Sequence, residues 1–484
     1  MAQTDFRGLQ VSPASAHSLE RYEAALNLLH GYYGDPLSVI DGALVDDPDF
    51  AMGHALRAGL MVTSGDGTAE PMLRQSVEAG EALGARANER ERRHFAAARA
   101  WLDGRFAQSI QAYGDIVVDY PHDILAIQVA HIGDFLLGHS SMLRDRIAQV
   151  LPHWNASLPG YSYLLGMHAF GLEEMQRYED AEARGREAVA LNPRDPWAIH
   201  AVAHVMEMQG RLDAGVDWLT ARREDWAEDN MLAVHNWWHL ALLLLEREQH
   251  DAVLALYDDH VARPAPAIAL DLVDAAALLW RLHLRGVDVG NRWIDVADDW
   301  QSRGAAGYYA FNDVHAIMAC LGAGRIDDVA AVYGAMQGAA MQGAAAAGRA
   351  NHGGGGTNGT MTAEVGLPMA EGLIAFERGD YEASIARLMP TRMICHRFGG
   401  SHAQRDVFTL TLIEAALRAG RVNLADALLA ERAALKAMNP ALGTMMSRAR
   451  ALREPGGMST ADPRPRPSPE SPGFDASPDV SPDA

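Results

Sequence analysis

The chain has 484 residues, of which 49% are hydrophobic and 21% are charged, and its 41 basic and 63 acidic residues give a net charge of −22. An excess of negative charge repels a phosphate backbone, so we expect no nucleic-acid partner. The apolar stretches are far shorter than the roughly 20 residues of a membrane span.

Other features of the composition concern location. The N-terminus lacks the basic and apolar regions of a secretory signal. Cys320 and Cys395 are the only cysteines, too few for a disulfide framework or a thiolate metal site. The sequence therefore favours a soluble, cytoplasmic protein.

In chain order, the sequence predicts a series of short helices separated by turns. Amphipathic segments at residues 14–29, 37–44 and 51–63 are separated by clusters of Gly, Asp and Pro, which end helices and form turns. Three later segments, 90–121, 161–193 and 364–390, each contain a helix, a turn, a second helix and a Pro stop. This order, with a period of about 34 residues, is the tetratricopeptide pattern. We therefore predict an all-α fold over residues 14–453, a tetratricopeptide-like α-solenoid of irregular antiparallel helix pairs.

Three segments lie outside the predicted repeats. Residues 1–13 are an N-terminal extension. Residues 334–360 contain a tandem Met-Gln-Gly-Ala-Ala duplication and four consecutive glycines, and they predict a flexible Gly/Ala-rich loop. Residues 454–484 contain eight prolines with Ser and Asp between them, and they predict a disordered acidic tail.

Histidines recur at the spacing of the predicted repeat. The intervals between successive members of the series His131, His168, His200 and His235 are 37, 32 and 35 residues, and His315 follows 80 residues later. This spacing indicates the same helix in successive units, which is the helix that lines the concave side of a solenoid.

The pattern around two of these histidines is typical of a metal site. His200, His204 and Glu207 are spaced i, i+4, i+7, and His235 and His239 are spaced i, i+4, so each set lies on one helix face. Imidazoles with a carboxylate suit zinc, iron or manganese, and we name all five residues as candidate ligands of a divalent metal. No Glu follows the first histidine of either pair, which excludes the metalloprotease motif. In the alternative interpretation the histidines are structural and pair with helix ends or buried carboxylates, and the residues alone leave both open.

Other polar and aromatic residues are weaker candidates for the groove. Trp237 and Trp238 point about 100° apart on a helix, so at most one of them, taken here as Trp238, faces a ligand. Arg405 could clamp a carboxylate or phosphate, or Arg405 and Asp406 could pair with neighbouring helices.

Two motifs, Ala198-Ile-His-Ala-Val-Ala-His-Val-Met-Glu-Met208 and Met231-Leu-Ala-Val-His-Asn-Trp-Trp-His239, resemble the tetratricopeptide repeat protein 38 family. The resemblance continues in residues 119–126, 286–293, 311–315 and 399–408 and covers roughly residues 15–450. It implies an α-solenoid of degenerate repeats and carries no activity. The Gly-rich segment and the Pro-rich tail are additions of this sequence.

Two functions follow from these observations. The first is a scaffold that binds a protein or peptide in its concave groove, the common use of such arrays. The second is an enzyme or small-molecule binder that uses the histidine cluster, with or without a metal ion. The base rate for this fold favours the scaffold.

Overall fold

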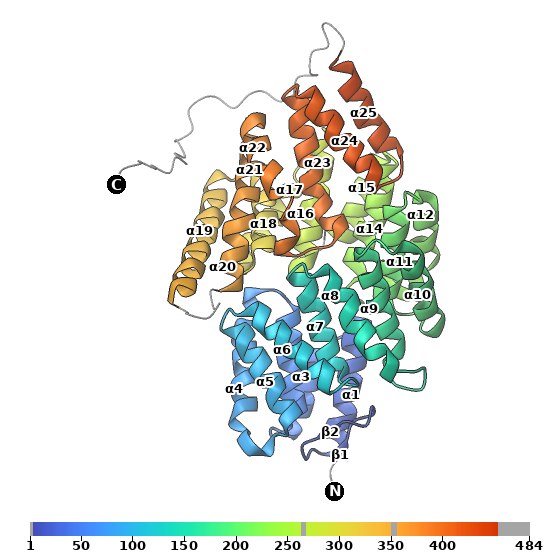
Figure 1. The fold of residues 1–484 in the computed structure, drawn as a ribbon, viewed down its shortest axis with the longest axis vertical. Helices are drawn as coiled ribbons and strands as arrows, with labels where there is room; N and C mark the ends of the chain where they lie inside the picture. The colour runs from blue at the N-terminus through green and yellow to red at the C-terminus, as the bar shows by residue number, and fades with distance from the viewer. Residues whose placement is uncertain (1–2, 263–267, 350–355, 454–484) are drawn as a thin grey trace.

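A computed structural model of the protein describes residues 3–262, 268–349 and 356–453. These residues are helical almost throughout, and their one sheet is an antiparallel pair of short strands, β1 Gln3–Thr4 and β2 Gln10–Val11. Figure 1 shows the helices following one another from the N-terminal end to the C-terminal end of an elongated molecule. The predicted all-α class and solenoid architecture are confirmed.

The α-helices of the first half are α1 Ala16–Gly31, α2 Pro36–Asp46, α3 Ala51–Thr63, α4 Glu70–Ala82, α5 Glu89–Leu102, α6 Phe106–Asp119, α7 Ile124–Leu136, α8 Ser140–Val150, α9 Tyr161–Glu174, α10 Tyr178–Leu191, α11 Pro196–Met208 and α12 Leu212–Ala221. Those of the second half are α13 Arg223–Trp226, α14 Ala233–Glu246, α15 His250–Leu256, α16 Ala269–Leu284, α17 Arg292–Arg303, α18 Ala310–Gly322, α19 Ile326–Arg349, α20 Thr357–Met361, α21 Leu367–Glu377, α22 Tyr381–Thr391, α23 His402–Arg418, α24 Val422–Leu435 and α25 Pro440–Ala451. Two π-helical turns, η4 Tyr257–Val261 and η5 Thr362–Gly366, follow α15 and α20.

One type of turn joins the two helices of successive pairs. In each case a residue with positive φ ends the first helix, and the next amide donates a hydrogen bond to the carbonyl five residues earlier. This is the Schellman arrangement, which satisfies a free carbonyl at a helix end and favours glycine because its φ is left-handed. Within the described residues the turn recurs ten times, at Tyr32, Gly104, Gly138, Gln176, Gly210, Glu248, Gly286, Gly324, Gly379 and Gly420.

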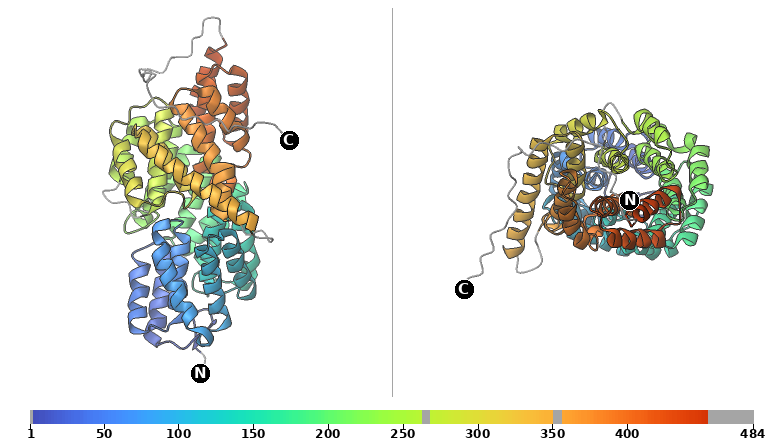
Figure 2. Two further views of the ribbon diagram at one scale, coloured as in Figure 1. Left: turned by 90° about the vertical axis from the view of Figure 1, so that its left-hand side faces the viewer. Right: turned by 90° about the horizontal axis from the view of Figure 1, so that it is seen from above.

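The stacked pairs curl into a compact superhelix. Seen from above, the helices lie in a ring around the long axis (Figure 2). Contacts between distant units hold this shape: Tyr33 forms a β-bridge with Asn230, and Trp101 Nε1 donates to the Tyr308 hydroxyl at 3.1 Å. Helix α16 also packs against α23, and α14 against α25. As a result, most buried apolar side chains from Val11 to Ala449 form one continuous core, and Leu172, Ala181 and Val205 form a small second cluster.

The predicted loop at residues 334–360 is wrong for much of its length. Helix α19 continues to Arg349 and α20 begins at Thr357, while residues 350–355 lie outside the described residues. Alanine is the strongest helix former, and the Ala-rich sequence keeps its helix despite the glycines. The glycines also serve packing, because a Cβ at Gly343 would lie 2.6 Å from Cα of Gly359. Their missing side chains let α19 and α20 meet backbone to backbone.

The N-terminal extension is part of the folded body. The hairpin of β1 and β2 is held by a buried ion pair of 2.7 Å between Arg7 and Glu23 of α1. Arg90 of α5 donates to the Gln10 carbonyl at 3.0 Å. The predicted Pro-rich tail, residues 454–484, lies outside the described residues.

Candidate functional site

The two predicted histidine pairs lie on α11 and α14, the first helices of consecutive units. Helix α11 begins at Pro196 after Asp195, whose carboxylate accepts a hydrogen bond from the Ala198 amide. Helix α14 packs against α11. Helical spacing places both histidines of each pair on the face that the other helix contacts.

The ring nitrogens of the four histidines converge. Nε2 of His200 lies 2.9 Å from Nε2 of His204 and 3.1 Å from Nε2 of His235. One ring nitrogen from each of these three and from His239 lies within 4.8 Å of all the others. The four residues are at most 4% exposed. The structure therefore brings together four of the five predicted metal ligands, and we call them the histidine cluster.

Carboxylates lie behind two of the rings. Nδ1 of His235 donates to Oδ2 of Asp274 on α16 at 2.7 Å. Nδ1 of His239 donates to Oε2 of Glu207 at 3.2 Å, and the other oxygen of Glu207 accepts from Nζ of Lys436 at 2.7 Å. Glu207 was predicted as a ligand, but it contacts the side of the His239 ring that faces away from the cluster. Its physical role here is to orient that ring.

A third carboxylate lies near the cluster without a hydrogen bond. Oε2 of Glu173, in the last turn of α9, is 3.5 Å from Nδ1 of His204. Both oxygens of Glu173 are buried and lack a hydrogen-bond partner. Burial raises the pKa of Glu173 well above its usual value, and the charges of Glu174 and Glu207 raise it further.

Three histidines of the cluster are neutral at neutral pH. Burial lowers the pKa of His200, His204 and His239 well below the usual value of a histidine, and the neighbouring imidazoles lower it further. A neutral imidazole keeps a lone pair on one nitrogen, which is the form that binds metals.

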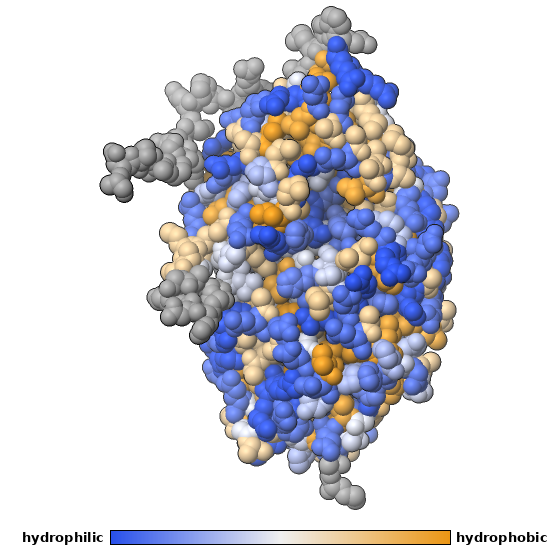
Figure 3. Space-filling view, viewed as in Figure 1, coloured by the Kyte–Doolittle hydropathy of each residue, from blue (hydrophilic) through white to orange (hydrophobic). Residues whose placement is uncertain are grey.

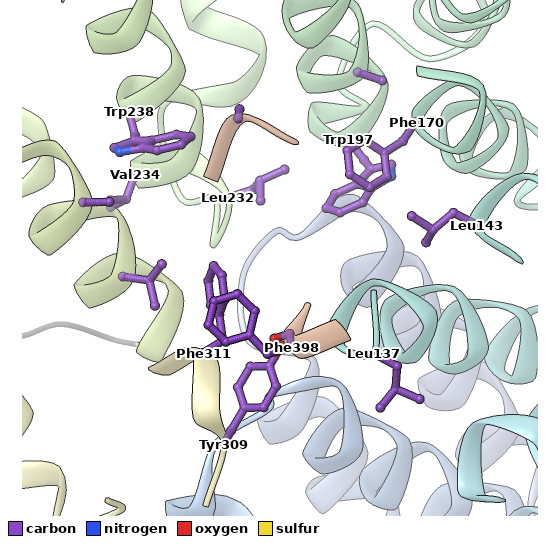
Figure 4. Packing of buried hydrophobic residues seen from close by; sticks show 14 of the residues in the cluster. Leu137, Leu143, Phe170, Trp197, Leu232, Val234, Trp238, Tyr309, Phe311 and Phe398 are labelled. Carbon is purple, nitrogen blue, oxygen red and sulfur yellow. Dashed lines mark hydrogen bonds between the residues drawn. The ribbon is translucent and has the colours of Figure 1, made fainter. Parts of the chain in front are cut away.

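Aromatic rings surround the cluster. The Trp238 ring stacks on His235, with centroids 5.3 Å apart and planes at 14°. Figure 4 shows Trp238 on one side of the interior and Trp197 with Phe170 on another, and these last two rings also contact His200. Trp237 instead stacks on His260 at 3.8 Å. Trp238 is thus the tryptophan that meets the cluster, and it packs there with 0% exposure instead of lining an open groove.

The other three predicted histidines, His131, His168 and His315, also lie on first helices. Among the described residues, the four ring nitrogens that lie within 4.8 Å of one another include none from these three. His131 on α7 packs edge-on against Phe170 and Trp197. His168 on α9 is half-buried, and burial with nearby arginines lowers its pKa to about 4. Nδ1 of His315 on α18 donates to the Phe311 carbonyl at 2.8 Å. The repeat spacing selects the helix but not the direction of the side chain.

Arg405 and Asp406 both have internal partners. The Arg405 guanidinium donates to the carbonyls of Gly399 and Gly400 and lies 3.5 Å from Glu174. Asp406 accepts from Arg432. These contacts favour the interpretation of Arg405 and Asp406 as structural residues, so neither is available to clamp a ligand.

A separate cavity of about 750 Å³ lies where the first helices of successive units end. Its wall includes the ends of α14, α16, α18, α21 and α23, and α25 lies across it. Charged and apolar side chains both line it, and they include Val289, Leu410, Glu414, Thr444, Met445 and Arg448. Both terminal nitrogens of Arg448 donate to Glu414 at 2.8 Å. None of the predicted groove residues lines this cavity.

Sequence reasoning missed the outer contacts of the cluster. Asp274 follows His235 by 39 residues, close to one repeat, so a search of the next first helix for acidic residues would have found it. Lys436 is 229 residues from Glu207, and no local signal links them.

No family model matches the chain. Among the described residues, no helix combines the length and the hydrophobicity needed to cross a membrane. Figure 3 shows hydrophilic side chains over much of one face, with apolar patches between them.

Proposed function

We propose that the protein is a tetratricopeptide-like scaffold of the cytoplasm that binds a peptide segment of a partner protein in the 750 Å³ cavity. The observation that carries the proposal is the cavity itself, which lies among the ends of five first helices with α25 across it. Binding sites for small ligands and side chains have volumes of about 300–1,000 Å³, and this cavity falls within that range.

The lining suits a segment with an apolar anchor next to polar or charged groups. Leu410, Val289 and Met445 offer apolar contact. Arg448, whose side chain is 39% exposed, offers a guanidinium already oriented by Glu414. A peptide backbone and its charged side chains can pair with such groups while the apolar anchor fills the cavity.

The histidine cluster supports catalysis less well. Its four residues are at most 4% exposed, so a substrate from solution would have to open the packing of α11 and α14 to reach them. The enzyme alternative therefore has less support than the scaffold.

The test is selection of a displayed random-peptide library on the full chain, followed by calorimetric titration of the enriched synthetic peptides. Thr444 is exposed on α25 and lines the cavity, so Thr444→Trp should fill its mouth and weaken peptide binding at least tenfold. Ser447 is exposed on the same helix outside the lining, and Ser447→Trp is the matched control that should bind normally. If the peptides bind both variants as tightly as the parent chain, the cavity is not the site. If the library yields no binder, the scaffold proposal fails.

A further inference from the structure

Beyond the scaffold, we propose that the protein contains a structural zinc site, in which His200, His204, His235 and His239 hold one zinc ion through their Nε2 atoms. The proposal is independent of the cavity and of any partner. Four observations on the cluster carry it.

The first observation is the spacing of the nitrogens. In a tetrahedral site with Zn–N bonds of about 2.0–2.1 Å, the ligand atoms lie about 3.3–3.4 Å from one another. The separations of Nε2 of His200 from Nε2 of His204 and of His235, 2.9 and 3.1 Å, are only a few tenths of an ångström shorter, and one nitrogen from each of the four rings lies within 4.8 Å of the others. Small rotations of the rings would therefore be enough to admit the ion.

The second observation is the protonation that the outer contacts impose. Because His235 and His239 donate their Nδ1 protons to Asp274 and Glu207, the Nε2 atom of each neutral ring carries a lone pair. Nε2 of His235 lies 3.1 Å from Nε2 of His200, and Nε2 of His239 is buried. Carboxylates that accept the far N–H of a ligating histidine are the usual outer contacts of a metal site.

The third observation is that the cluster cannot satisfy its own polar atoms. A neutral imidazole has one proton, so Nε2 of His200 can donate to only one of its two close neighbours. Nε2 of His239 is buried and has no hydrogen-bond partner. A cation at the centre would accept these lone pairs together.

The fourth observation is charge. Three carboxylates, those of Asp274, Glu207 and Glu173, lie within 3.5 Å of ring nitrogens of the cluster. Lys436 pairs with Glu207, whereas both oxygens of Glu173 are buried without a hydrogen-bond partner. A cation held by the four rings would lie close to these carboxylates, whose oxygens attract positive charge.

The geometry also indicates which metal and which role. Four imidazole nitrogens in a closed arrangement suit zinc, and a site with all four positions filled by the protein is structural. The ion would join α11 to α14 and, through the outer contacts, to α9, α16 and the end of α24. It would thus fix the packing of consecutive units in the middle of the solenoid.

The experiment uses the full chain, produced without a polyhistidine tag in zinc-supplemented medium and dialysed against metal-free buffer. Elemental analysis should find one zinc per chain. Cobalt(II) added to the metal-free chain should give the intense visible absorption of a tetrahedral site, and zinc should abolish that absorption. A folded parent chain that neither carries zinc nor gives this spectrum would overturn the proposal, whatever the variants do.

Variants locate the ion. His204→Ala combined with His239→Ala should lose the zinc, whereas His315→Ala, which removes a buried histidine of another first helix, should keep it. Asp274→Asn leaves all four ligands in place and should weaken zinc binding by about 10–100-fold. This variant tests the site if the double variant does not fold. Zinc retained in full by the folded double variant, or unchanged affinity in Asp274→Asn, would place the ion elsewhere and refute the assignment.

Discussion

The contact between Lys436 and Glu207 should be among the most costly to break in this protein. Lys436 is 6% exposed, and its Nζ donates to Glu207 at 2.7 Å. Burial lowers the pKa of Lys436, but the charges of Glu207 and Asp406 outweigh it and raise that pKa above its usual value. Lys436→Met keeps the length of the side chain and removes its charge, so Glu207, at 3% exposure, is left as a buried carboxylate that contacts only His239.

The expected loss of folding stability follows from the burial of Glu207. Removing one partner of a buried ion pair costs about 3–5 kcal/mol, because the remaining charge stays out of water without compensation. An exposed pair of almost the same length, Arg421 with Glu382 at 2.8 Å, is the matched comparison, since both side chains are more than half exposed. Arg421→Met should change stability little, because water screens the pair and solvates the charge that remains.

The assay is urea denaturation followed by far-ultraviolet circular dichroism, with the two methionine variants and Lys436→Met combined with Glu207→Gln. The double variant should regain a substantial part of the loss, because a buried amide costs less than a buried carboxylate without its partner. The argument from burial is wrong if Lys436→Met and Arg421→Met lower the free energy of unfolding equally. It is also wrong if adding Glu207→Gln to Lys436→Met restores none of the lost stability.

Two further predictions concern the glycines of α19 and α20 and the buried carboxylate of Asp123. Gly359→Val would place a Cβ 2.5 Å from an α-carbon of α19, so it should lower the free energy of unfolding by about 1–3 kcal/mol in thermal melting. Gly338→Ala, in α19 with nothing within 4 Å, should instead raise it by about 0.5–1 kcal/mol. Burial disfavours the charge of Asp123, but His94 and Arg90 hold the pKa of this carboxyl below its usual value. The stability that ionised Asp123 contributes should therefore be complete above about pH 4 and should decline as the pH falls further. The difference in melting temperature between the parent chain and Asp123→Asn should therefore shrink in acid, and a difference that is constant from pH 7 to about pH 3 would contradict this linkage.

Much of the fold could be predicted because its signals are local. Gly and Pro act on the backbone of their own and adjacent residues, so the turns and helix ends are visible in the sequence. The predicted helix at 51–63 coincides with α3, and the one at 14–29 is within two residues of α1 at each end. Where two local preferences compete, the prediction failed: glycine suggested a loop after residue 334, but alanine and the contact of Gly343 with Gly359 keep α19 helical.

The candidate site could be predicted only in part. The i, i+4 spacing placed His200 with His204 and His235 with His239 on single faces, since this depends on helix geometry alone. Which face turns inward depends on how each helix rotates in the stack. That rotation is set by packing, and it directs four histidines to one point and His131 elsewhere.

The sequence by itself determined the helices, the repeat and the stripes of histidine, because each depends on interactions within a few residues. Only the tertiary structure decided that the stripes meet, that they are buried and not in a groove, and that Glu207 contacts the outer side of a ring. The contact of Glu207 with Lys436, 229 residues away, shows the physical reason. Closure of the superhelix brings distant segments together through summed packing of the whole chain, and no local pattern records it.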